Sequence, residues 1–259
     1  MPFTLAHPAA ILPLRGIRYL RTAPLVIGAL IPDLWYYLPG ALARLVPQTH
    51  SFQGSVTIDP LLGYATLVAV FVLRAPLTAL LRPRARWLCL QALAPFRASA
   101  REWLLAPIAI LLGVWTHIAW DSFTHEGGWV VRRVAVLSAP VVIGPYTGTL
   151  CHVLQYLSSV FGLTVLAVWY LRLPAPAPPP SSRARSASGP ALLLAAVAAI
   201  LIGSVQAMEQ IERAPTPSVY RTFEVFLTHG LAWFGALYLL AGIIVTLEAV
   251  HDRESGFGA

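Results

Sequence analysis

Residues 103–125 read WLLAPIAILLGVWTHIAWDSFTH. This apolar run has three ionisable side chains in its last part, and these are His117, Asp121 and His125. The hydrocarbon core of a membrane is about 30 Å thick and needs about 20 residues of helix, so the run is long enough to cross it. An ionisable side chain is costly inside a bilayer and is therefore a candidate for function. The stretch predicts a membrane helix that carries a functional site.

The composition of the whole chain also indicates an integral membrane protein. Of its 259 residues, 57% are hydrophobic and 11% are charged, whereas soluble domains carry about 25% charged residues. Lysine is absent, so all 18 basic residues are arginines, and they are spread between the apolar runs. This distribution is typical of topology control and of contact with anionic headgroups. We therefore expect membrane lipids as partners and no nucleic-acid partner.

Six apolar segments are candidates for membrane helices, and together they predict an all-α fold, a polytopic helical bundle with a short extra helix at the N-terminus. The candidate segments are residues 22–42, 58–81, 103–124, 152–171, 190–208 and 224–248. If these spans alternate in direction, thirteen arginines lie on one side of the membrane and five on the other. The positive-inside rule then predicts both termini on the cytoplasmic side of a bacterial inner (plasma) membrane.

A segment rich in proline and serine divides the chain. Residues 174–190 read PAPAPPPSSRARSASGP, a composition typical of a linker. We expect residues 1–173 to form the module with the polar site, residues 174–189 to be the linker, and residues 190–259 to form a C-terminal pair of membrane helices. Between His125 and His152, prolines and glycines interrupt an apolar stretch, which predicts a re-entrant or surface-lying segment over the site.

Seven histidines and aspartates in the first 152 residues are candidate metal ligands. They are His7, Asp33, His50, His117, Asp121, His125 and His152. Histidine and aspartate bind divalent ions such as Zn²⁺, so we expect one or two divalent ions, with zinc as the first choice. Residues four apart in a helix share a face, which lets His117 and Asp121 reach one ion. In a continuous helix His125 would lie about 12 Å above His117, too far for both histidines to bind one ion easily. His125 would then suit a second ion, unless the helix ends first and the chain folds back.

The position of these residues along the predicted spans leaves two interpretations open. With alternating spans, six of the seven lie in the outer half of the membrane or just beyond it, whereas His7 starts on the inner side. His7 can join the others only if residues 5–14 dip into the membrane. Alternatively, His117 and Asp121 form a buried hydrogen-bonded pair between helices, and Asp33 caps a helix break.

Short motifs along the first 160 residues resemble known families. The opening Pro2-Phe-Thr-Leu-Ala-His7-Pro-Ala-Ala, followed by Ile27-Gly-Ala-Leu-Ile-Pro32-Asp33, resembles an uncharacterised bacterial integral-membrane family, a domain of unknown function. The order of motifs also resembles the membrane-bound metal-dependent hydrolases. The corresponding motifs here are Thr4/His7, Gly28/Pro32-Asp33, Thr49-His50-Ser51 and His117/Asp121.

More distantly, this order of motifs is similar to the zinc-dependent phospholipase C fold. That resemblance implies metal ligands at His7, Asp33, His50, His117 and Asp121, with His125 and His152 as further ligands. The chain departs from the pattern at two places. The phospholipases carry a glutamate one helical turn after their last histidine, where this chain has Gln155 and Tyr156. The Thr-His motif is also looser here, because two residues separate Thr4 from His7.

These resemblances imply a membrane-embedded, metal-dependent hydrolase that acts on a phosphoester, most plausibly a lipid or lipid-linked headgroup. Asp33 and Asp121 would then be the catalytic residues, as carboxylates that bridge ions or act as a base. Two other classes stay open. The same side chains would serve a transporter or ion relay, or they would only pair with one another in a non-enzymatic membrane scaffold.

Overall fold

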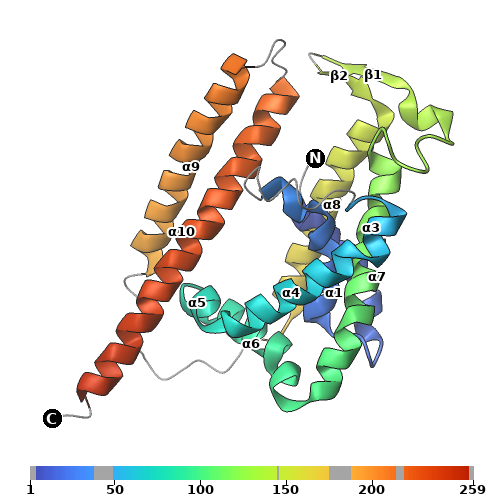
Figure 1. Ribbon diagram of the computed structural model, residues 1–259. Helices are drawn as coiled ribbons and strands as arrows, with labels where there is room; N and C mark the ends of the chain where they lie inside the picture. The colour runs from blue at the N-terminus through green and yellow to red at the C-terminus, as the bar shows by residue number, and fades with distance from the viewer. Residues whose placement is uncertain (1–3, 38–48, 145, 175–187, 214–218, 257–259) are drawn as a thin grey trace. The chain divides into compact units, whose positions relative to one another are not determined.

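The computed structural model describes residues 4–37, 49–144, 146–174, 188–213 and 219–256, and it is almost entirely helical (Figure 1). The chain divides into two compact units. The first contains residues 1–35, 40–67 and 98–173, and the second contains residues 36–39, 68–97 and 174–259.

The first unit begins with short helices and ends with two long ones. Its 3-10 helices are η1 (Thr4–Ile11), η2 (Leu14–Gly16), η3 (Ile31–Tyr37) and η4 (Ala135–Ser138). Its α-helices are α1 (Thr22–Leu30), α3 (Phe52–Val56), α7 (Ala100–Thr124), α8 (Leu150–Arg172) and most of α4 (Ile58–Val72). Its strands are β1 (Pro140–Ile143) and β2 (Tyr146–Thr149).

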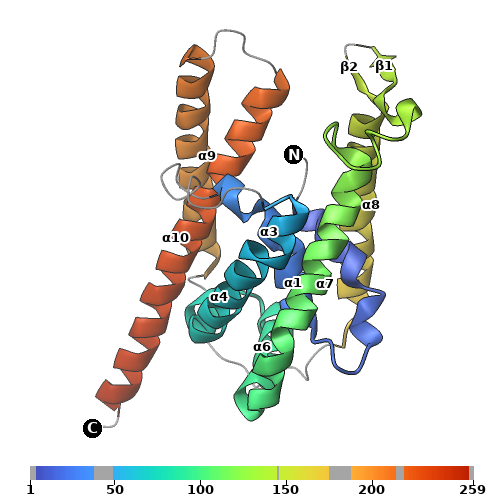
Figure 2. The same ribbon diagram turned by 45° about the vertical axis from the view of Figure 1, so that its right-hand side comes forward.

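The core of this unit is the packing of α1 along α7, which Figure 2 shows side by side. Glycines let the two backbones touch. A Cβ atom on Gly28 would lie 2.1 Å from the carbonyl oxygen of Ile110, and one on Gly113 would lie 2.3 Å from that of Leu25. Because both obstacles are backbone atoms, no side chain fits at either position. The helix η1 packs against α1, α7 and α8, so the N-terminal segment is part of this core.

Four helices in the described residues are long and apolar enough to cross a membrane. They are α7, α8, residues Leu192–Arg213 of α9 and residues Val225–Asp252 of α10. They coincide with the four predicted spans at residues 103–124, 152–171, 190–208 and 224–248. The count of six spans is not confirmed.

The other two predicted spans correspond to broken helices. In the segment 22–42, α1 has 9 residues and passes at Ile31 into η3, and residues 38–48 lie outside the described part of the chain. In the segment 58–81, α4 has 15 residues, and α5 (Arg74–Ala79) follows after a break at Leu73. Proline lacks the amide hydrogen that a continuous helix needs, and Pro32 and Pro76 lie just after these breaks.

The segment between α7 and α8 forms a small hairpin, which is the one departure from the all-α prediction among the described residues. The strands β1 and β2 pair antiparallel, from Pro140 opposite Thr149 to Ile143 opposite Tyr146. Valine and isoleucine in β1 favour the extended backbone, and Gly144 adopts a positive φ of 55° at the turn. Val142 and Ile143 are mostly exposed, so this part of the segment lies on the surface of the protein.

The second unit contains α5, α6 (Pro83–Ala98), α9 (Ser188–Arg213) and α10 (Val219–Gly256). The helices α9 and α10 pack together closely where Gly203 faces Gly230, since a Cβ atom on Gly203 would lie 2.9 Å from the Cα atom of Gly230. The helix α10 also packs on α5, where Tyr238 Oη donates a hydrogen bond to Leu77 O at 2.8 Å. Of the predicted linker 174–189, residues 175–187 lie outside the described residues.

Candidate metal centre

His117 is the most buried member of the polar cluster, and the packing of α1 on α7 orients its ring. Its side chain is completely buried, and its Nδ1 donates a hydrogen bond to Ala29 O at 2.8 Å. This bond places the ring hydrogen of the neutral side chain on Nδ1, so the lone pair lies on Nε2. Nε2 is buried, has no hydrogen-bond partner in the described part of the chain, and lies 3.2 Å from Asp121 Oδ2 and 3.6 Å from Asp33 Oδ1. A lone pair facing two carboxylates is repelled unless a cation or a proton lies between them.

His50 approaches the same two carboxylates from the turn before α3. Its Nε2 lies 3.2 Å from Asp33 Oδ1 and 3.4 Å from Asp121 Oδ2. Its Nδ1 lies 3.3 Å from Thr49 Oγ1, and the Thr49 hydroxyl donates to Pro32 O at 2.9 Å. The hydroxyl oxygen can therefore accept a hydrogen from His50 Nδ1, which again leaves Nε2 facing the carboxylates.

His7 repeats this arrangement from η1. Its Nδ1 lies 3.2 Å from Thr4 O, and its Nε2 lies 3.0 Å from Asp121 Oδ1. Its ring stacks on that of His117 with a centroid distance of 3.8 Å. Thr4 also donates a hydrogen bond of 2.6 Å to Asp33 Oδ2, which leaves Asp33 Oδ1 facing the histidines. The N-terminal segment thus contributes both a histidine and the hydroxyl that orients Asp33.

His125 reaches the cluster through Asp121, which lies four residues before it. Thr124 is the last residue of α7, and His125 has an extended backbone, with φ −115° and ψ 139°. Its Nδ1 lies 3.3 Å from Asp121 Oδ1, and its Nε2 lies 2.9 Å from the side-chain amide of Gln155. Residues four apart share one face of a helix, so the helical period places Asp121 next to both His117 and His125.

The histidines and aspartates of the cluster shift each other's pKa values. Burial acts against the charged form of Asp33 and would raise its pKa, but attraction to His117 and His50, whose Nε2 atoms face it, outweighs burial and holds the pKa well below its usual range. Burial likewise would lower the pKa of His50, but the carboxylates of Asp121 and Asp33 outweigh it and raise the pKa to about 9. Protons on the imidazoles thus compensate the carboxylates, and a bound cation would displace them.

The spacing of the inward-facing atoms matches a metal coordination shell. One ligand atom from each of Asp33, His50, His117 and Asp121 lies within 4.8 Å of the others. Zinc ligands lie about 2.1 Å from a tetrahedral ion and hence about 3.4 Å from each other, and four of the distances between these atoms are 3.2, 3.2, 3.4 and 3.6 Å. The imidazole and carboxylate donors also suit zinc or another divalent transition metal.

The seven predicted ligands therefore separate into three groups. Asp33, His50, His117 and Asp121 form the compact cluster, and His7 and His125 join it through Asp121 Oδ1. His152 does not belong to the compact cluster, and its Nε2 lies 3.9 Å from Glu126 Oε1.

Sequence reasoning missed one acidic residue near this site, Asp59 at the start of α4. Asp59 is completely buried, and neither of its carboxylate oxygens has a hydrogen-bond partner among the described residues. Burial raises its pKa to about 6, although the positive charges of His50 and His117 act in the opposite direction. An aspartate inside the apolar run 58–81 was itself a visible signal, because the rule that singles out Asp33 and Asp121 applies equally to Asp59.

These features define a helical protein with four helices able to cross a membrane and a buried histidine–aspartate cluster able to hold a metal ion. The chain belongs to a family of unknown function, DUF4184, whose model matches residues 1–247. The expected membership of an uncharacterised family is thus confirmed. No curated protein and no solved structure matches the chain.

Proposed function

We propose that this protein is a membrane-embedded, metal-dependent hydrolase that cleaves a phosphoester on a lipid or lipid-linked headgroup. The observation that carries the proposal is the arrangement of three histidines around two aspartates. In His7, His50 and His117 the Nδ1 atom lies by an oxygen of the surrounding protein and the Nε2 atom faces the carboxylates. Metal-binding histidines typically have such an outer partner, because it fixes the tautomer and the ring orientation.

Asp121 supports the presence of two ion positions. Its Oδ2 faces His50 and His117, whereas its Oδ1 faces His7 and His125. Asp121 would therefore help to hold ions through both of its oxygens, with a different set of histidines at each. His50, His117 and Asp33 would complete the first position, and His7 and His125 would contribute to the second.

Ions bound there would supply Lewis acidity to the phosphoester and lower the pKa of the attacking water. We assign Asp33 the role of an ion ligand through Oδ1, because Thr4 occupies its Oδ2 and leaves Oδ1 facing the cluster. The attacking water loses a proton to solvent as its oxygen bonds to phosphorus, the bond from phosphorus to the leaving alcohol breaks, and the alcohol oxygen takes up a proton from solvent. His50 is about one-third exposed and is the member of the compact cluster nearest to solvent or lipid, so we place substrate entry beside it.

The location of the site agrees with a lipid-type substrate. His117 and Asp121 lie in the last third of α7, and we propose that this end faces the outer side of a bacterial plasma membrane with both chain termini in the cytoplasm. The arginine distribution supports this orientation.

The first test is the metal content of the purified protein, measured by elemental mass spectrometry. We expect about two equivalents of zinc, manganese or iron, and strong loss in His117→Ala and Asp121→Ala. The matched control is His229→Ala, because His229 binds Gln206 in the second unit and has no role in the cluster. A well-folded, supplemented protein with less than one equivalent would favour the scaffold interpretation.

The second test is hydrolysis of phospholipids and lipid-linked phosphates by the protein in nanodiscs, with and without added Zn²⁺ or Mn²⁺. Activity should rise with pH through about 7 and disappear on chelation. Headgroup release that persists in a His117→Ala/Asp121→Ala double variant would exclude this site. A metal-loaded protein that is inactive on the whole panel would favour the transporter or ion-relay alternative.

A further inference from the structure

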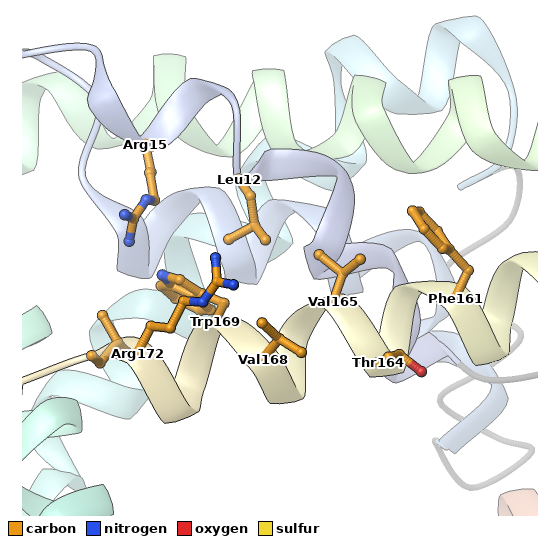
Figure 3. Close-up of a pocket in the computed structure, with 9 residues that line it drawn as sticks. Leu12, Arg15, Phe161, Thr164, Val165, Val168, Trp169 and Arg172 are labelled. Atoms are coloured by element: carbon orange, nitrogen blue, oxygen red, sulfur yellow. The ribbon is translucent and has the colours of Figure 1, made fainter.

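A groove of about 470 Å³ lies between α8 and the N-terminal segment, away from the histidine–aspartate cluster (Figure 3). Its apolar wall contains Leu12, Phe161, Val165 and Val168. The α8 members of this wall are spaced four and three residues apart and therefore share one face of the helix.

The two arginines of the groove lie at one end of it, on either side of Trp169. Arg15 comes from η2 and Arg172 from the last turn of α8, and Figure 3 shows both guanidinium groups beside the indole ring. The Arg15 Cζ atom lies 5.4 Å from the centre of that ring. No acidic residue lines the groove, and neither arginine forms an ion pair within the described residues. Two like charges near each other are unfavourable, so this end of the groove favours an anion.

Trp169 adds a hydrogen-bond donor to this positive end. Its Nε1 is buried and has no hydrogen-bond partner among the described residues. A buried donor without an acceptor is costly, so an oxygen that reaches it would be stabilising. The polar end thus combines two unpaired positive charges with one unused N–H group.

The dimensions of the groove match one leaflet of a bilayer. Phe161 and Arg172 are eleven residues apart, which corresponds to about 16 Å along a helix, or about half of the hydrocarbon thickness. Gln155, which contacts His125 of the cluster, is about 25 Å from Arg172 by the same rise per residue. The positive end of the groove is therefore at the opposite end of α8 from the histidine–aspartate cluster.

We propose that this groove binds an anionic phospholipid, with the phosphate between Arg15 and Arg172 and one acyl chain along the apolar wall. The lipid comes from the leaflet opposite to the cluster, so it is a structural ligand and not a substrate. It links η2 to α8 and thereby holds in place the N-terminal segment that carries Thr4 and His7. This proposal does not rest on the hydrolase activity.

The test uses phosphatidylglycerol with brominated acyl chains, which quenches tryptophan fluorescence on contact. The protein is reconstituted in detergent micelles with increasing amounts of brominated phosphatidylglycerol or brominated phosphatidylcholine. We expect phosphatidylglycerol to quench at lower concentration, and Trp169→Phe to remove this saturable part of the quenching. The double variant Arg15→Gln/Arg172→Gln should require roughly 30-fold more phosphatidylglycerol, since each arginine near anionic lipid contributes about fivefold.

Arg133→Gln is the matched control, because Arg133 also lies against a tryptophan, Trp129, but outside the groove. It should keep the preference for phosphatidylglycerol. If the double variant does not fold, two other measurements test whether the groove binds phosphatidylglycerol. These are lipid quenching of the single variant Arg172→Gln and the thermal stabilisation of the unchanged protein by phosphatidylglycerol. Equal quenching by the two lipids, an unchanged preference in a folded arginine variant, or full competition by glycerol phosphate would each overturn the proposal.

Discussion

Replacing Gly113 by alanine should disrupt both the fold of the first unit and the metal centre. The new Cβ atom would lie 2.3 Å from Leu25 O and 2.8 Å from Ala29 N, which are backbone atoms of α1 and cannot rotate away. Favourable contacts between heavy atoms need about 3.5 Å, so α1 and α7 must separate locally by about 1 Å. Overpacking of this kind costs about 1–3 kcal/mol of folding free energy.

The same displacement should weaken metal binding. Ala29 O accepts the hydrogen bond from His117 Nδ1 at 2.8 Å, and a shift of about 1 Å would break it. Loss of such an outer partner typically weakens metal affinity by about 10- to 100-fold. Gly113→Ala should therefore lower both the unfolding temperature and the affinity for Zn²⁺.

Gly235→Ala in α10 is the matched control. No described atom lies within 4 Å of a Cβ at Gly235, so alanine is accommodated there. Alanine favours a helix over glycine by up to about 1 kcal/mol, so this variant should be as stable as the original protein or more so. Thermal unfolding of both variants in one detergent, followed by titration of the ion-free proteins with Zn²⁺, measures both effects. A Gly113→Ala protein as stable as Gly235→Ala, with unchanged zinc affinity, would refute this account of the packing.

Three further predictions concern topology, pH and stoichiometry. A single cysteine at Arg84, in a variant without other cysteines, should resist an impermeant thiol reagent on intact cells, and labelling would reverse the proposed orientation. The pKa of Asp59 is raised to about 6, so the folded, ion-free protein binds more protons than the unfolded chain between about pH 4 and pH 6. The free energy of unfolding should therefore fall as the pH rises through about 6, by up to about 3 kcal/mol. Asp59→Asn should remove this pH dependence in denaturant titrations. An equal pH dependence in the variant would contradict the prediction. His125→Ala should lower the metal content from about two equivalents to about one, and a count that stays at two would remove His125 from the second position.

Local sequence patterns were sufficient for much of the fold. The spans α7 and α8 follow from uninterrupted apolar runs, because the number of residues needed to cross a bilayer depends only on the rise per residue and the membrane thickness. The pairing of His117 with Asp121 follows from the helical period in the same way. The cost of a charged group in an apolar stretch also identifies candidate site residues from the sequence, and it applies to Asp59 as well as to Asp33 and Asp121.

Tertiary contacts decided the rest. His7 reaches Asp121, 114 residues further along the chain, only because η1 packs against α7 and α8. His117 is oriented by Ala29 O, 88 residues earlier in the chain, only because α1 packs against α7. Composition and periodicity are properties of neighbouring residues, whereas the position of a ligand depends on where distant backbones meet. Gly28, for example, lies against the backbone of Ile110. No local pattern in the sequence shows that these two residues are in contact.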